Sequence, residues 1–384
     1  MQVICRGACA RRRLCVIRRL IQTLRQLRRV VLIFFAFASS SFAYGPLGHE
    51  IVGAIADRKL AGSSTAEKIK TLLDGIPLER ASLIADDIKS WDKNGPDDRR
   101  GIHFLPHPAI EQQLRDFWKA NPPGPDASDT TPSHHWMHYT DVPVLDAEKY
   151  GDGKTGRGNW DVVHTIPYCI GVLRGEIAEN NPRKITKTIA VILLAHCIGD
   201  IHQPLHVGAE YFNEAGEPID PDRGVTGLGD EGGNALSLVH NATAERPRHY
   251  YHSFHAYWDL DTVRNLTIGT PDEVPKAERE SVYALAKEKL IANFVANEPK
   301  NWRTPGDPKA WAEQWANEIL PIAREAHTRV RFEHVHHEER DGRVFAKGEA
   351  HEIGTGYLDW STAVVGDELH KAGWRLADLL QKIL

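Results

Sequence analysis

The chain has 384 residues, 41% of them hydrophobic, and a formal net charge of −5. This length and apolar content suffice for one large or two ordinary folded domains, which excludes a disordered chain. Its five cysteines are too few for a disulfide scaffold, and three of them lie within the first 15 residues. The other two, Cys169 and Cys197, could form one bridge or remain buried free thiols.

The first 43 residues differ in composition from the rest of the chain. They contain nine Arg, no Lys and no acidic residue, and include an apolar run over residues 30–38. Together with small residues at Ser41 and Ala43, this is typical of an export signal cleaved before Tyr44. An uncleaved membrane anchor and a twin-arginine signal are the alternatives. We expect residues 1–43 to be a signal peptide and the mature protein to be secreted or periplasmic.

Signal cleavage would make the mature protein strongly acidic. Loss of the nine Arg takes the formal net charge from −5 to −14. Such a protein has no broad basic surface that could bind nucleic acid through counterion release. A polyanionic substrate would therefore require local positive charge, which bound metal ions can supply.

Apolar residues at helical spacing dominate the mature chain, whereas strand-like alternation is short and rare. Ser64 and Glu67 predict a capping box for a helix over 64–74 that stops at Gly75. The segment 185–199 is apolar nearly all round, which indicates a buried central helix.

Later segments continue the helical pattern. Amphipathic helices are expected at 276–297, 308–328 and 361–384, and Pro321 should bend the second of them. Polar excursions are expected at 121–132 and 209–250. The sequence thus predicts one all-α domain over residues 44–384.

Two pairs of His and Asp share one spacing. His196 and Asp200 lie four residues apart on the predicted central helix, and His255 and Asp259 repeat the interval. Side chains at this spacing project from one helix face, where an imidazole and a carboxylate can bind the same cation. One pair is weak evidence, but two pairs together with His206 favour a metal site. Imidazole and carboxylate ligands with open positions suit catalytic zinc.

Further motifs accompany these pairs, in the order Tyr44-Gly-Pro-Leu-Gly-His49, Ala85-Asp-Asp-Ile-Lys89, Met137-His-Tyr-Thr-Asp141, Ala195-His-Cys-Ile-Gly-Asp-Ile-His-Gln-Pro-Leu-His206, Gly232-Gly-Asn234, His255-x-x-x-Asp259 and Ala372-Gly-Trp-Arg-Leu-Ala377. The set resembles the secreted single-strand-specific zinc nucleases of fungi and plants, which also act as 3′-nucleotidases. These nucleases share a superfamily with zinc phospholipase C. The resemblance implies a single multi-helix, all-α domain with a trinuclear zinc cleft.

The resemblance also implies the ligands of three Zn²⁺ ions. The first zinc would bind Asp86, His138, His196 and Asp200, and the second His206, His255 and Asp259. The third would bind His49, Asp200 as a bridge, and the amino nitrogen and carbonyl oxygen of Tyr44. Signal cleavage would then be part of the catalytic mechanism, because only a cleaved chain has a free amine at Tyr44.

The activity implied is endonuclease cleavage of single-stranded DNA and RNA, with 3′-nucleotidase activity on mononucleotides. Metal-activated water would attack phosphorus. Asp141 would orient the water or a bound base, and Lys89 would neutralise the phosphoryl oxygens. Tyr139 would stack on a base and Asn234 would bind its edge. We expect a monomer without a stable membrane partner.

Some positions depart from the family pattern. Tyr44 replaces the usual Trp, although only its backbone would be a ligand. Lys89 replaces Arg and lacks its bidentate geometry. The insertion around 220–250 alters the expected base pocket. The alternatives are a zinc phospholipase C, a nonspecific phosphatase and a secreted protein whose zinc is not catalytic.

Other histidines carry weaker signals. His334, His336 and His337 precede a predicted turn and are expected in a solvated loop. His202 is expected in a supporting or surface position. His134 and His135 are expected in a loop before His138.

Overall fold

The computed structural model describes residues 44–89, 91, 107–122, 134–146, 148–239, 250–269, 278–340 and 343–384. Backbone contacts divide the chain into residues 1–40 and 41–384, and all described residues belong to the second unit. The predicted signal segment and most of the predicted excursion at 121–132 lie outside the described residues. None of the described helices is long and apolar enough to cross a membrane.

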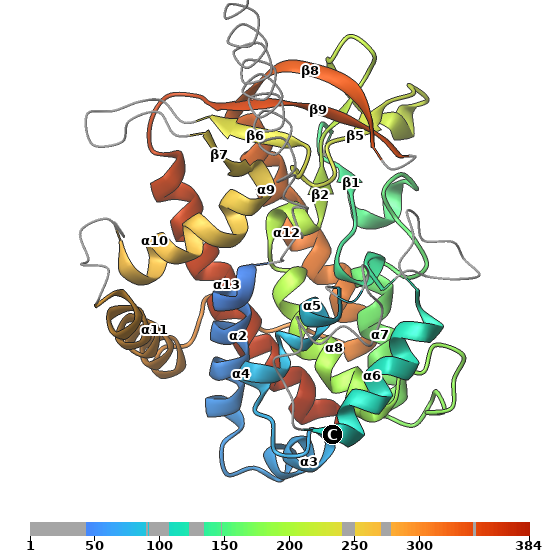
Figure 1. The fold of residues 1–384 in the computed structure, drawn as a ribbon, viewed down its shortest axis with the longest axis vertical. Coiled ribbons are helices and arrows are strands. Elements are labelled where there is room, and N and C mark those ends of the chain that lie inside the picture. The colour runs from blue at the N-terminus through green and yellow to red at the C-terminus, as the bar shows by residue number, and fades with distance from the viewer. Residues whose placement is uncertain are drawn as a thin grey trace, which may run out of the picture. The chain divides into compact units, whose positions relative to one another are not determined.

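Helices make up most of the described fold, which confirms the predicted all-α class (Figure 1). The α-helices are α2 (Gly45–Leu60), α3 (Ser64–Leu72), α4 (Leu78–Ala81), α5 (Ile84–Lys89), α6 (Pro108–Ala120), α7 (Val162–Leu173), α8 (Lys187–Asp200), α9 (Phe254–Ala256), α10 (Thr262–Ile268), α11 (Arg279–Ala296), α12 (Trp311–Thr328) and α13 (Tyr357–Ile383). Short turns of other helix types include η4 (Trp136–His138), η6 (Pro204–His206), η10 (Pro308–Ala310) and the π-helix η8 (Tyr257–Asp261).

Helix α8 is the central helix that the sequence predicts. Every residue from Thr188 to Asp200 is buried. The helix begins after Thr186, whose side chain accepts a hydrogen bond from the backbone N–H of Ile189. It packs against α7, α13, α2 and several shorter helices. A helix surrounded on all sides buries an apolar surface all round, which explains its sequence pattern.

Helix α2 runs along α13 and also packs against α4 and α8 (Figure 1). Two glycines allow this close approach. A Cβ at Gly373 of α13 would lie 2.6 Å from Ile55 Cβ, and one at Gly53 of α2 would lie 2.4 Å from the carbonyl oxygen of Leu78. The N-terminal turn of α2 is thereby held against the core, next to the end of α8.

Several helix boundaries differ from the prediction. The predicted capping box of Ser64 is wrong, because Ser63 is the N-cap and its side chain accepts from the N–H of Ala66. Helix α13 begins at Tyr357, about one turn before the predicted 361. Helix α12 begins at Trp311 after a 3₁₀ turn and continues through Pro321. These ends depend on local capping geometry, which apolar periodicity does not report.

The strands form three small sheets. Strands β1 (Val142–Pro143) and β2 (Gly208–Ala209) pair in parallel, and the order β4-β3-β5 joins Pro218–Ile219, Tyr211–Phe212 and Leu228–Gly229. The third sheet has the order β7-β6-β9-β8, with strands Tyr250–Ser253, Leu236–Val239, Arg343–Glu352 and Val330–Arg340. The predicted excursion at 209–250 therefore contributes residues to all three sheets.

The β8–β9 hairpin corrects one prediction. His334, His336 and His337 lie in β8 and not in a loop. A bulge between Glu333 and His336 shifts the register against β9. A bulge interrupts the two-residue alternation that identifies a strand in sequence, which is why the pattern was not recognised.

The structure also decides between the alternatives for Cys169 and Cys197. Cys169 on α7 and Cys197 on α8 are both buried free thiols. Burial raises the pKa of both thiols. Cys197 donates to the carbonyl oxygen of Met137, one residue before His138. These thiols act as small core side chains.

Candidate metal centre

The last turn of α8 presents two potential ligands to one side. His196 and Asp200 are both fully buried, and His196 Nε2 lies 3.2 Å from Asp200 Oδ2. His196 Nδ1 lies 2.6 Å from the carbonyl oxygen of Ser82 and donates to it. Because Nδ1 carries the proton, Nε2 of the neutral ring has a lone pair, and this lone pair faces the carboxylate of Asp200.

Two further helical segments bring ligands to this pair. His138 from η4 places Nδ1 2.8 Å from His196 Nε2 and 3.1 Å from Asp200 Oδ2. Asp86 from α5 places Oδ1 3.6 Å from His196 Nε2 and 3.9 Å from His138 Nδ1. Asp86, His138 and His196 form one group able to hold a metal ion. We call these three residues and Asp200 the first cluster.

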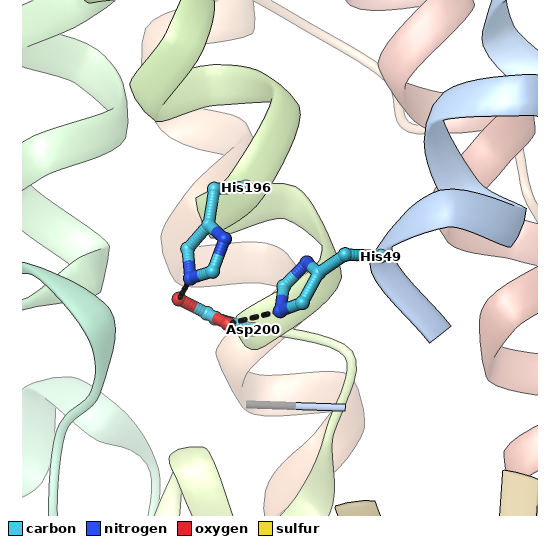
Figure 2. Close-up of side chains that lie close together, drawn as sticks. All are labelled: His49, His196 and Asp200. Carbon is cyan, nitrogen blue, oxygen red and sulfur yellow. Dashed lines mark ion pairs between the residues drawn. The ribbon is translucent and has the colours of Figure 1, made fainter. Parts of the chain in front are cut away.

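His49 lies beside His196 and reaches the other oxygen of the Asp200 carboxylate (Figure 2). His49 Nε2 lies 3.4 Å from Asp200 Oδ1, and its ring stacks on that of His196 with centroids 3.9 Å apart. Neither ring nitrogen of His49 has a hydrogen-bond partner in the described structure, although the residue is fully buried. A Cβ at Gly199 would lie only 2.9 Å from His49 Nδ1, so this approach requires glycine. An uncompensated buried imidazole beside a carboxylate is what a metal ligand leaves when the ion is removed.

The second cluster consists of His206, His255 and Asp259. The Nε2 atoms of the two imidazoles lie 3.0 Å apart, and His255 Nε2 lies 3.2 Å from Asp259 Oδ2. His206 comes from η6, directly after α8, whereas Asp259 lies in the π-helix η8. Gln203 Nε2 donates to Asp259 Oδ1 at 2.8 Å and holds this carboxylate in place. The family resemblance implied that these three side chains meet, and the structure brings their ligand atoms together.

Backbone carbonyls set the tautomers of the two imidazoles in the second cluster. His206 Nδ1 donates to the carbonyl oxygen of His138 at 2.9 Å, and His255 Nδ1 donates to that of Gly232 at 2.7 Å. In the neutral rings both Nε2 atoms therefore carry lone pairs, which face each other. Burial lowers the pKa of His206 to about 4, so its ring is neutral at pH 7. Burial acts to lower the pKa of His255, but Asp259 outweighs it and raises that pKa. The site therefore favours positive charge between the two imidazoles and the carboxylate, which a shared cation supplies.

The spacing of the ligand atoms fits zinc. Two ligand atoms about 2.0–2.1 Å from a tetrahedral zinc lie about 3.3 Å apart. Distances of 2.8–3.9 Å join neighbouring ligand atoms in the two clusters, and His49 lies 3.4 Å from Asp200. Burial acts to raise the pKa of Asp86, but Lys89 and three nearby imidazoles outweigh it and lower the pKa to about 2. Asp86 is therefore a carboxylate at neutral pH, as a metal ligand must be.

Tyr44 is the N-cap residue of α2 and contacts the second cluster. Its backbone N–H donates to Asp259 Oδ1 at 3.1 Å, and its carbonyl oxygen accepts from the N–H of Gly48 at 3.0 Å. Its hydroxyl donates to the carbonyl oxygen of His202 at 2.7 Å. These contacts join Tyr44 to Asp259. They do not join its backbone to His49 or Asp200, the partners that the sequence analysis expected.

Four other predicted site residues lie near the clusters. Lys89 Nζ is 2.9 Å from Asp86 Oδ1. A Cβ built on Gly232 would lie 3.5 Å from both Asp141 Oδ1 and His255 Nδ1, which places Asp141 beside the second cluster. Tyr139 follows His138 directly in the chain, and its ring is half-buried.

Asn234 occupies the tight turn that follows Gly232 and Gly233. Its side-chain amide donates to the carbonyl oxygen of Glu231 at 3.0 Å. Gly232 and Gly233 both have positive φ, at 60° and 81°, a conformation that favours glycine. The turn thus determines the position of the Gly232 carbonyl, which orients His255, and also the position of Asn234.

Sequence reasoning missed one aromatic side chain at this site. Trp136 stacks on Tyr139, with ring centroids 5.1 Å apart and planes inclined by 25°. It lies three residues before Tyr139, a spacing that brings side chains together only because η4 is helical. The short length of that turn left no periodic signal.

Two histidine predictions are refined by the structure. His202 is fully buried, with Nδ1 donating to the carbonyl oxygen of Ile198 and Nε2 accepting from Arg375. It supports the end of α8 and lies away from the surface. His134 is also buried, and its Nδ1 pairs with the carbonyl oxygen of Asn121. Both side chains have structural partners, so neither joins the clusters.

Comparison with known proteins agrees with this geometry. The S1/P1 nuclease family matches residues 44–384. The chain is also similar to Endonuclease 2 of Arabidopsis thaliana, with 25% identity over 199 residues. That match spans 50% of this chain and 58% of the plant protein, which is less than two thirds of its length. Because the family match covers all of the described fold, the chain belongs to the S1/P1 nuclease family.

Proposed function

We propose that this protein is a zinc-dependent endonuclease that hydrolyses phosphodiester bonds of single-stranded DNA and RNA and also acts as a 3′-nucleotidase. Membership of the S1/P1 nuclease family supports nucleic acid as the substrate. The two buried clusters of imidazoles and carboxylates support metal dependence. The single observation that carries the proposal is the opposed pair of His206 and His255 Nε2 atoms at 3.0 Å.

We assign three Zn²⁺ ions to the described ligands. The first cluster would hold one ion and the second cluster another, while His49 and Asp200 would hold the third together with the backbone of Tyr44. When bound, zinc lowers the pKa of water to about 7 and stabilises negative charge on phosphoryl and leaving oxygens. The orphaned ring nitrogens of His49 support its role as a ligand.

The residues of the chain prepare the site for a phosphate ester. Lys89 lies within 2.9 Å of Asp86 and brings a fixed positive charge to the edge of the first cluster. We assign it to the phosphoryl oxygens, whose charge it neutralises. Asp141 is placed beside His255, where its carboxylate orients the attacking water or a bound base. Its half-buried side chain allows contact with substrate.

Preference for unpaired strands follows from the aromatic residues. Tyr139 adjoins the ligand His138 and is supported on one ring face by Trp136. A base can stack on such a platform only when its own face is exposed, which a duplex prevents. Asn234 has an amide that can bind the base edge, and it sits in the same turn that orients His255.

Maturation and location follow from the assigned role of Tyr44. A free α-amino group at this residue requires removal of residues 1–43, which have the composition of an export signal. We therefore propose that the mature enzyme is secreted or periplasmic. We also propose that it acts as a monomer on single strands and 3′-mononucleotides, with no stable membrane partner.

Substrate digestion with matched variants tests the proposal. The mature chain from Tyr44 should cleave single-stranded DNA and RNA faster than duplex and release phosphate from 3′-AMP. A chelator should abolish both activities, and zinc should restore them. His206→Ala should lose zinc and activity, whereas His337→Ala, an exposed histidine on β8, should keep both.

The rival functions give different outcomes in the same experiment. Hydrolysis of phosphatidylcholine without release of phosphate from 3′-AMP would indicate a phospholipase C. Activity confined to simple monoesters would indicate a phosphatase. Zinc binding without turnover of any of these substrates would indicate a non-catalytic zinc protein.

A further inference from the structure

The β8–β9 hairpin carries a separate group of potential ligands. Glu333, His334 and Glu349 each place one ligand atom within 4.8 Å of the others. His351 adds a second imidazole, with Nε2 2.9 Å from Glu349 Oε2 and 3.3 Å from Glu333 Oε2. All four residues belong to the hairpin, and none belongs to the two clusters described above. Their side chains are exposed or half-buried, so an ion in solvent can reach them.

A bulge brings His334 to this group. In a regular strand, adjacent residues point to opposite faces, so His334 would lie on the face opposite to Glu333. Instead His334 has a φ of 56°, and two residues of β8 stand opposite Gly348 of β9. A Cβ at Gly348 would lie 2.8 Å from Val335 Cγ2, so glycine is required there. The bulge turns the imidazole of His334 toward the two carboxylates.

The charges of the group favour a cation. Glu333 and Glu349 are direct cross-strand partners in the antiparallel register. Like charges in this position destabilise a strand pair. Arg331 pairs with one oxygen of Glu333, at 2.7 Å from its Nε. His351 contacts both carboxylates and thereby fixes the orientation of their oxygens. In metal sites, hydrogen-bond donors next to the ligands have the same orienting role.

Another carboxylate group in the protein shows the contrast. Glu148, Asp220 and Asp222 also lie close enough to hold an ion. There, however, Arg157 occupies the centre, with contacts of 3.0 Å to Glu148 and 2.8 Å to Asp222. An internal guanidinium already neutralises these carboxylates. In the hairpin group Arg331 contacts one carboxylate, that of Glu333, but the side chain that bridges both carboxylates is the imidazole of His351.

We propose that Glu333, His334 and Glu349 form an additional binding site for a divalent transition-metal ion such as Zn²⁺, with His351 orienting both carboxylates. One imidazole nitrogen and two carboxylate oxygens suit zinc, and water completes its coordination. The site joins the two strands of the hairpin next to the bulge. It therefore stabilises β8 against β9, and β9 in turn pairs with β6, which follows the Gly232–Asn234 turn.

Zinc titration of the holoenzyme tests this site. With its tightly bound zinc retained, the wild-type protein should bind one further equivalent of Zn²⁺, measured by isothermal titration calorimetry. His334→Asn should weaken this binding at least about tenfold, because Asn accepts the positive φ but lacks the imidazole. Glu349→Gln should weaken it similarly. His337→Asn removes a neighbouring exposed imidazole and should bind as wild type does.

Two further readouts separate the site from the catalytic clusters and from misfolding. Hydrogen exchange of residues 330–352 should slow on zinc addition in wild type but not in His334→Asn. Digestion of single-stranded DNA should be unchanged by His334→Asn, since the ion lies outside both clusters. Failure of wild type to bind a further equivalent, or equal binding by His334→Asn, would overturn the proposal. In that case the hairpin group is an ion-pair network centred on His351.

Discussion

The Nε2 atoms of His206 and His255 lie 3.0 Å apart while their Nδ1 atoms donate to the carbonyl oxygens of His138 and Gly232. The two rings come from segments 49 residues apart in the chain. The carbonyl that orients each ring belongs to another segment of the chain. The position of each Nε2 atom therefore depends on the backbone conformation of that segment. Changes to the supporting turns should therefore alter metal binding without touching a ligand.

Gly232→Ala should reduce both zinc content and nuclease activity. The residue has a φ of 60°, and a Cβ there would lie 2.4 Å from the carbonyl oxygen of Leu205. The turn must move, and its carbonyl then no longer orients His255 Nδ1. We expect activity to fall at least about tenfold, measured as single-strand cleavage alongside zinc content.

Gly224→Ala is the matched control for this prediction. Gly224 also has a positive φ, at 85°, but a Cβ there meets no atom within 4 Å. It should lose about 1 kcal/mol of stability from backbone strain and keep its zinc. Equal losses of zinc in the two variants would show that strain alone, and not the orientation of His255, accounts for the effect.

A blocked N-terminus should inactivate the enzyme. Tyr44 is buried, and its backbone nitrogen lies 3.1 Å from Asp259 Oδ1, next to the proposed ligands. One alanine added before Tyr44 converts the Tyr44 amine into an amide, moves the free amine one residue away and adds bulk in this place. We expect at least about a tenfold loss of activity and the loss of one equivalent of zinc by elemental analysis.

Removal of the added alanine by an aminopeptidase should restore zinc content and activity. This recovery shows that the chain had folded correctly with the extension present. Full activity and zinc content before removal would contradict the assigned role of the Tyr44 amine.

Tyr139→Ala should weaken substrate binding more than turnover. Stacking on an aromatic ring contributes about 1–3 kcal/mol per base, which corresponds to an increase of KM by roughly 5-fold to 160-fold. Tyr139→Phe keeps the ring and should behave as wild type. Trp136→Ala removes the ring stacked on Tyr139 and should have an intermediate effect.

Steady-state kinetics on a short single-stranded oligonucleotide measure this difference. A fall in kcat with unchanged KM in Tyr139→Ala would argue against a base-stacking role. It would point instead to displacement of the adjacent proposed ligand His138.

Glu210→Gln should change the pH dependence of stability. Burial raises the pKa of Glu210 from its ordinary value of 4.5 to about 7, with His327 opposing the increase and Asp230 adding to it. Between these pH values the folded state binds more protons than the unfolded state, so stability falls as pH rises from about 4.5 to about 7. Above pH 7 the loss is complete and amounts to up to about 3 kcal/mol.

Urea unfolding at constant zinc, at pH 5 and pH 8, measures this effect. The gain in stability of Glu210→Gln over wild type should be larger at pH 8 than at pH 5. Glu214→Gln alters an exposed carboxylate in the same segment and should show no such difference. An equal effect of Glu210→Gln at both pH values would contradict the raised pKa.

Local spacing accounts for the parts of the site that the sequence predicted. His196 and Asp200 share a helix face because of their separation by four residues, and the apolar run around them required a buried helix. Asp86, His138 and His49 were associated with them only through family resemblance, because no local pattern joins segments so far apart. The structure brings their ligand atoms within 4 Å.

The sequence by itself determined the helical class, the central helix and the residue types available for metal binding. Tertiary structure alone decided which lone pairs face one another, since the carbonyls of Ser82, His138 and Gly232 set the imidazole tautomers. It also decided that His334 lies on a bulged strand beside two carboxylates. Helical periodicity is a property of neighbouring residues, whereas these contacts depend on backbone positions that only the packed fold fixes in space.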